Sequence, residues 1–146
     1  MFRAIVTFIA VIAATLTIAD SDKLAAQWKS RYEEISRVVR AKNLPKFESY
    51  IAAEYIWVLA DGETKKRAEA LLEFTPLFEM KKIVGGEKIV GVTKRGDVIE
   101  VTFESNWTFT GKDNKIIRSH EIGIDSWKKF EGKWLIVRTQ DKAPGN

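Results

Sequence analysis

The residues of this sequence best suited to chemistry are a few isolated acids, one histidine and two tyrosines. General acid–base catalysis needs a carboxylate or an imidazole in a dry pocket, with a donor that stabilises developing negative charge. The catalytic candidates are therefore Asp125, Glu54 and His120, with the hydroxyl groups of Tyr32 and Tyr55 as donors. Asp125 has the best case, because large aromatic residues adjoin it and would raise its pKa. The alternative is a structural aspartate that is salt-bridged or solvated.

His120 is the single histidine of the sequence, and its neighbours Arg118, Ser119 and Glu121 are all polar. A metal site recruits several His, Cys or carboxylate ligands at regular spacing, and the sequence has no such spacing. The absence of cysteine excludes disulfides, thiolate zinc sites and a cysteine nucleophile. We expect no metal and no cofactor, and a surface histidine is the alternative to an acid–base role for His120.

Aromatic residues supply the candidates for an apolar pocket. Five Trp and eight Phe are many for 146 residues, and such rings fill cores, line concave sites or anchor interfaces. Ordinary core packing is the alternative to a pocket. The predicted pocket residues are Trp28, Tyr32, Tyr55, Trp57, Phe103, Trp107 and Trp127.

Length and charge limit the classes of protein. A chain of 146 residues fits one domain with a full core. The net charge of +4 is dispersed along the sequence and forms no basic stripe, so nucleic-acid binding is not expected.

The first nineteen residues have the pattern of a secretory signal peptide. A basic start at Arg3 precedes an uncharged apolar run that ends in Thr17-Ile18-Ala19, with small residues where a signal peptidase cuts. The run is shorter than the roughly 20 residues of a spanning helix. We expect cleavage after Ala19, a single domain over residues 20–146, a secreted or periplasmic location and no membrane contact after cleavage. An uncleaved anchor is the alternative.

The elements that must position these side chains begin with helices. Apolar residues at helical spacing, Leu24, Trp28, Tyr32, Ile35 and Val39, predict one helix that Asp20 or Ser21 caps. Residues 43–45 (Asn-Leu-Pro) predict the start of a second, short helix that holds residues 47, 50 and 51. A short strand over 53–59 follows, and a third helix is expected over 63–74, with Ala68, Leu71 and Leu72 as its inner face and Pro76 at its end.

The remaining residues predict an antiparallel meander. Strands are expected over 77–84 and 87–94 around a Gly85-Gly86 turn, then over two long runs beginning near Asp97 and Lys115, and last over 134–140. In the Asp97 run the odd positions from Ile99 to Phe109 are mostly apolar, so one face belongs to the core. Gly123 is a candidate bulge. We predict an α+β fold with a curved mixed sheet, and a homodimer through the outer sheet face.

Three stretches resemble the nuclear transport factor 2-like superfamily, in particular its SnoaL-like, ketosteroid isomerase-like and domain-of-unknown-function branches. They are residues 41–44 (AKNL), 53–55 (AEY) and 125–134 (DSWKKFEGKW). The resemblance covers almost all of the chain after residue 19. It implies a conical half-barrel whose curved sheet is covered by three N-terminal helices, with a pocket between them and often a homodimer. Members often carry aspartate where this chain has Asn43 and Glu54, and histidine where it has Gln140.

This scaffold hosts many functions, so function has to come from the site. We expect an exported domain, with no complete catalytic set, that binds a small apolar or aromatic ligand. One alternative is an isomerase-, cyclase- or dehydratase-like enzyme with a pocket carboxylate as general base. Another is an adaptor that binds a protein partner through its outer sheet face.

Overall fold

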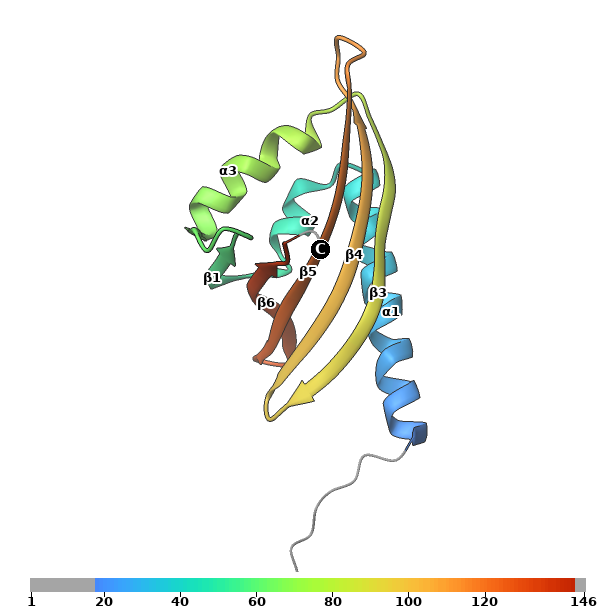
Figure 1. Cartoon of the computed structure of the whole chain (residues 1–146), viewed down its shortest axis with the longest axis vertical. Coiled ribbons are helices and arrows are strands. Elements are labelled where there is room, and N and C mark those ends of the chain that lie inside the picture. Colours follow the sequence, from blue (N-terminus) through green and yellow to red (C-terminus); the bar gives the residue numbers. More distant parts are fainter. Residues whose placement is uncertain (1–17, 144–146) are drawn as a thin grey trace, which may run out of the picture.

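The fold is a curved sheet with helices packed on one side (Figure 1). The computed structural model describes residues 18–143. In chain order the elements are α1 (Ile18–Arg40), α2 (Leu44–Glu48), β1 (Ile51–Val58), β2 (Thr64–Lys66), α3 (Arg67–Phe78), β3 (Lys82–Arg95), β4 (Val98–Thr110), β5 (Ile116–Phe130) and β6 (Lys133–Asp141). The α+β class is as predicted.

The six strands form one mixed sheet in the order β2-β1-β6-β5-β4-β3. The β1–β6 pair is parallel and all other neighbours are antiparallel. Because β2 and β3 lie at opposite edges, the sheet does not close into a barrel. The long strands β3, β4 and β5 bow together, and the β4–β5 hairpin projects beyond the rest of the molecule (Figure 1).

Helix α1 packs on the sheet through the predicted apolar stripe. Trp28, Tyr32, Ile35 and Val39 are all buried, and Leu24 packs against their edge. Asn43 caps α2 as expected, because its side chain accepts a hydrogen bond from the Lys46 amide at 3.1 Å. The packing of α1 places this helix against the sheet, and the Asn43 cap sets where α2 begins.

The predicted turn at Gly85-Gly86 is wrong, because β3 runs unbroken through both glycines. Gly85 pairs with Trp107 and Gly86 with Asn106 on β4. Gly85 has φ +117°, and a Cβ there would lie 2.0 Å from the Asn106 carbonyl oxygen. Here glycine permits a close approach of two strands and not a change of direction.

The third helix lies four residues further along the chain than predicted. Residues 64–66 form the edge strand β2, and α3 contains Pro76 instead of ending before it. As a result Ala70 and Phe78 are buried, whereas Leu72 is 75% exposed and not on the inner face. Pro76 removes one helical hydrogen bond near the last turn, where that loss costs least.

The alternation in β4 and β5 decides which residues face the helices. The odd residues of β4 from Ile99 to Phe109 are buried, as predicted. In β5 the inner face holds Gly123, Asp125 and Trp127. Gly123 is not a bulge: its pairing with Phe103 is regular, and the register shift toward β6 comes after Ser126.

The predicted signal peptide, residues 1–19, lies almost wholly outside the described residues. Of the helices in residues 18–143, none has the length and apolar character needed to cross a membrane.

Candidate functional site

A cavity of about 320 Å³ lies between the helices and the inner face of the sheet. Fourteen of the 22 residues that line it are apolar or aromatic, and they come from α1, α2, α3, β1, β4, β5 and β6. This volume and character are typical of sites for small organic molecules. The aromatic members are Phe47, Tyr55, Trp57, Phe74, Phe78, Phe103, Trp107 and Phe109.

Asp125 projects from β5 into the inner part of this cavity. It is 5% exposed, and both of its carboxyl oxygens accept hydrogen bonds: Oδ2 from the Tyr32 hydroxyl at 2.6 Å and Oδ1 from the Thr139 hydroxyl at 2.6 Å. Trp127 Nε1 donates to the Tyr32 hydroxyl at 2.9 Å. Burial raises the pKa of Asp125 to about 6, although the two hydrogen bonds to its charged form lower it.

Glu87, on β3, is the second inner carboxyl. Its backbone amide donates to the Ser36 hydroxyl at 3.0 Å, and its carboxyl group has no hydrogen-bond partner among the described residues. Burial, together with the charges of Asp125 and Glu121, raises the pKa of Glu87 to about 8. A carboxyl group with this pKa is mostly protonated at neutral pH, so it can donate a hydrogen bond or a proton.

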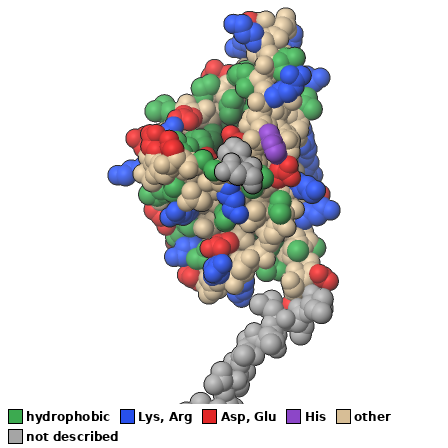
Figure 2. Space-filling view, viewed as in Figure 1, with side chains coloured by type: hydrophobic (Ala, Val, Ile, Leu, Met, Phe, Trp, Pro, Cys, Tyr) green, Lys and Arg blue, Asp and Glu red, His purple; other side chains and the backbone are tan. Residues whose placement is uncertain are grey.

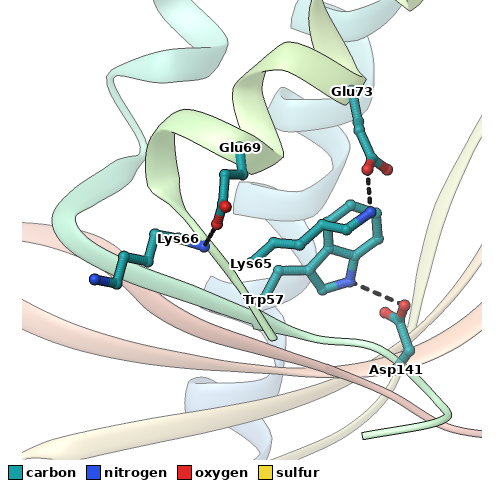
Figure 3. Close-up of polar contacts among 6 residues, drawn as sticks. All are labelled: Trp57, Lys65, Lys66, Glu69, Glu73 and Asp141. Carbon is teal, nitrogen blue, oxygen red and sulfur yellow. Dashed lines mark hydrogen bonds and ion pairs between the residues drawn. The ribbon is translucent and has the colours of Figure 1, made fainter. Parts of the chain in front are cut away.

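The rim of the cavity carries further acids. Trp57 Nε1 donates to Asp141 at 2.9 Å, and the Lys65 ammonium is ion-paired with Glu73 (Figure 3). Burial raises the pKa of both Asp141 and Glu121. Within residues 18–143, no three His, Cys, Asp or Glu side chains are grouped so as to hold a metal ion.

Solved structures with this architecture establish the type of fold. A protein from Cytophaga hutchinsonii described as NTF2-like superposes with a TM-score of 0.56 at 12% identity, over 88% of this chain and 100% of its own. The chain has a nuclear transport factor 2-like fold. No family model matches the sequence, and no curated protein matches it.

Other proteins with the nuclear transport factor 2-like fold differ in what they do. A hexachlorocyclohexane dehydrochlorinase superposes with a TM-score of 0.63 at 15% identity, over 84% of this chain and 87% of its own. The association domain of CaMKII from C. elegans superposes with a TM-score of 0.61 at 14% identity, over 85% of this chain and 99% of its own. At such low identities the likeness is one of fold.

On this nuclear transport factor 2-like scaffold, the three catalytic candidates do not lie together. Asp125 lines the cavity, but Glu54 is exposed, because it lies next to Tyr55 on β1 and points to the opposite face. The His120 side chain likewise points away from the cavity, because its neighbours on β5, Ser119 and Glu121, are the residues that face inward. Its Nε2 is hydrogen-bonded to Glu104 at 2.8 Å, and the side chain lies on the surface, where histidine is coloured purple in Figure 2.

The predicted pocket residues divide into two groups. Tyr55, Trp57, Phe103 and Trp107 line the cavity. Trp28, Tyr32 and Trp127 do not, because they pack against one another where α1 lies directly on the sheet. The ring centroids are 5.0 Å apart for Trp28 and Trp127, and 6.0 Å apart for Tyr32 and Trp127.

Glu87 is the functional candidate that sequence reasoning missed. Because a turn was predicted at residues 85–86, Glu87 was not assigned to either face of the sheet. A signal was nevertheless present: Ile83, Gly85, Glu87 and Ile89 alternate with outward residues, so an unbroken strand would have placed Glu87 inside.

Proposed function

We propose that this protein binds a small, largely apolar organic molecule in the cavity between the helices and the sheet. The observation that carries the proposal is the aromatic lining itself, because a volume of about 320 Å³ with mostly apolar walls suits a compact ring system. Trp57 and Trp107 belong to these walls, so a bound molecule would change their fluorescence.

A pair of substitutions on β4 tests this proposal. Ser105 is 3% exposed and lines the cavity, whereas the adjacent Asn106 is exposed on the other face. Ser105→Phe places a ring inside the cavity, and Asn106→Phe adds the same ring outside it. In a thermal-shift and fluorescence screen of small aromatic compounds, we expect hits that Asn106→Phe retains and Ser105→Phe loses. Equal binding to both variants would rule out the cavity as the site.

We also propose a homodimer through the outer face of the sheet. Three aliphatic side chains on that face are exposed: Val84 at 46%, Ile116 at 54% and Ile122 at 37%. Arg118 and His120 separate Ile116 from Ile122 on this face, and single apolar residues on a surface are common, so the main support for the dimer is the resemblance to nuclear transport factor 2-like proteins. Sedimentation should give a dimer that Ile122→Glu dissociates, while Leu72→Glu, on α3, leaves it intact. A stable monomer would favour the adaptor alternative instead.

Export is a further part of the proposal, and the sequence of residues 1–19 supports it. Mass spectrometry of protein recovered from its native host should give a mature chain that begins at Asp20. An intact Met1 on a membrane-bound product would contradict cleavage.

The alternative function is acid–base catalysis, and the two inner carboxyl groups favour it. Asp125, with a pKa near 6, is ionised at neutral pH and suited to accept a proton, while Glu87, with a pKa near 8, is suited to donate one. A substrate screen would have to give turnover whose pH profile rises near pH 6 and falls near pH 8. Turnover that survives both Asp125→Asn and Glu87→Gln would exclude this mechanism.

A further inference from the structure

The polar side chains of the cavity are strongly biased toward acids. Five carboxyl groups line it, Glu73, Glu87, Glu121, Asp125 and Asp141. Among the described residues that line it there is no Lys, Arg or His. Glu73 and Glu121 are exposed at the edge of the cavity, and Glu73 is ion-paired with Lys65, but Glu87, Asp125 and Asp141 form no ion pair among the described residues. Burying such like charges without counter-charges is unfavourable, and an apolar ligand supplies none. A positively charged group on the ligand would therefore stabilise these acids.

Glu87 has the clearest need for such a partner. Glu87 lines the cavity and is partly buried, and its carboxyl group has no hydrogen bond from any described residue. The charges around it are Asp125 and Glu121 from β5, and Glu33, Arg37 and Arg40 from α1. Glu87 also lines a second, more open depression together with the two arginines, and Arg40 donates to the Gly85 carbonyl at 2.7 Å. No described side chain forms an ion pair with Glu87.

At the rim of the cavity, two lining residues, Trp57 and Glu73, already hold a cationic group, the ammonium of Lys65. The Lys65 Nζ atom lies 5.4 Å from the centroid of the Trp57 ring and is ion-paired with Glu73. In Figure 3 the lysine side chain runs along the indole ring to reach that carboxylate, while the indole N–H is directed at Asp141. An ammonium group held between an aromatic face and a carboxylate is the arrangement used to recognise organic cations.

We propose that the ligand is an organic cation, a protonated or quaternary amine on an apolar body. The charged group lies near Glu87 and Asp125, and the body packs against Trp57, Phe103 and Trp107. This inference rests on the proposed function and adds the charge of the ligand to it. Because burial and the neighbouring acids raise the pKa of Glu87 to about 8, its carboxyl group is mostly protonated at neutral pH in the free protein. A bound cation would stabilise the ionised form, so binding releases a proton.

The test compares three probes of similar size on the full chain: phenyltrimethylammonium, its uncharged isostere tert-butylbenzene, and benzoate. The ammonium probe carries a permanent charge, so its own titration does not enter. By calorimetry at pH 8 we expect it to bind at least about tenfold more tightly than tert-butylbenzene. Benzoate should bind most weakly.

The pH dependence and one variant identify the carboxyl group. The affinity for phenyltrimethylammonium should rise by about tenfold or more from pH 6 to pH 9, with proton release at pH 7. Glu87→Gln should remove most of that rise and of the proton release. Glu104 is a partly exposed acid outside the cavity, so Glu104→Gln should keep both.

The outcomes separate this inference from the function on which it rests. If tert-butylbenzene binds as tightly as the ammonium probe, the cavity binds apolar ligands and the inference is wrong. Tighter binding of benzoate would also overturn it. If no probe binds, both the proposed function and the inference fail. A cation that binds equally well to the wild type and to Glu87→Gln across the pH range would remove Glu87 from the site.

Discussion

The substitution Glu87→Gln should make the ligand-free protein more stable at alkaline pH. Glutamine keeps the shape of the side chain and cannot ionise. In the unfolded chain Glu87 has its ordinary pKa of 4.5, whereas burial and the neighbouring acids raise it to about 8 in the fold. Below pH 4.5 the carboxyl group is neutral in both states and its contribution to stability is complete. As the pH rises to 8, the unfolded chain loses the proton first, and that contribution is lost.

The magnitude follows from the size of the shift. A pKa change from 4.5 to about 8 corresponds to a loss of up to about 5 kcal/mol in the free energy of unfolding across this range. Because Glu87 is only partly buried, solvent screening reduces this loss, and about 2 kcal/mol is the low end of the expected range. Asp125 adds a smaller loss, up to about 3 kcal/mol, as the pH rises from its ordinary pKa of 3.8 to about 6, and this loss is common to wild type and variant.

Urea unfolding at pH 5 and pH 9 provides the measurement. The wild type should lose stability between these values by about 2–4 kcal/mol more than Glu87→Gln does. Glu104→Gln is the control, because the Glu104 carboxylate is ion-paired on the surface and its pKa is lowered instead. If the wild type and Glu87→Gln show the same pH dependence, Glu87 is not a buried carboxyl group, and the reasoning about the cavity loses its main support.

Two further substitutions test the structure around the cavity. Tyr32→Phe removes a hydrogen bond to Asp125 and leaves the buried Trp127 N–H without its partner, so it should cost about 2–4 kcal/mol in unfolding free energy and raise the pKa of Asp125, as seen by NMR titration. An unchanged Asp125 pKa would show that the hydrogen bond is absent in solution. Gly85→Ala should destabilise the protein by more than about 2 kcal/mol, whereas Gly91→Ala, where a Cβ meets no atom within 4 Å, should be nearly neutral in the same thermal melt. Similar melting temperatures for these two variants would contradict the continuous β3 strand.

Helical and strand periodicity predicted the parts of the molecule that depend on one buried face. The stripe from Trp28 to Val39 and the odd positions of β4 are buried as expected, because core burial selects apolar residues at the period of each element. The resemblance of three sequence stretches to nuclear transport factor 2-like proteins predicted the arrangement of these elements, and the fold confirms it.

The site was only partly predictable, because periodicity shows which residues share a face and not which face turns inward. Asp125 and Trp127 were assigned to one face of β5, but whether that face met the helices depended on the other strands. Glu87 was missed for a different reason. A Gly-Gly pair is typical of turns, and only the approach of the Asn106 carbonyl to Gly85 shows why glycine is needed within a strand.

The parallel pairing of β1 with β6 determines when during folding the cavity comes into existence. Ile51 pairs with Ile136, so this contact joins distant parts of the chain and is entropically costly to form. Strand β6 also supplies Thr139, which holds Asp125, and Asp141, which holds Trp57. A nascent chain that has not yet released β6 can form α1 and the β3–β5 meander but has no binding site. Ligand would therefore be captured only after synthesis of the last strand, and its binding reports a fully assembled sheet.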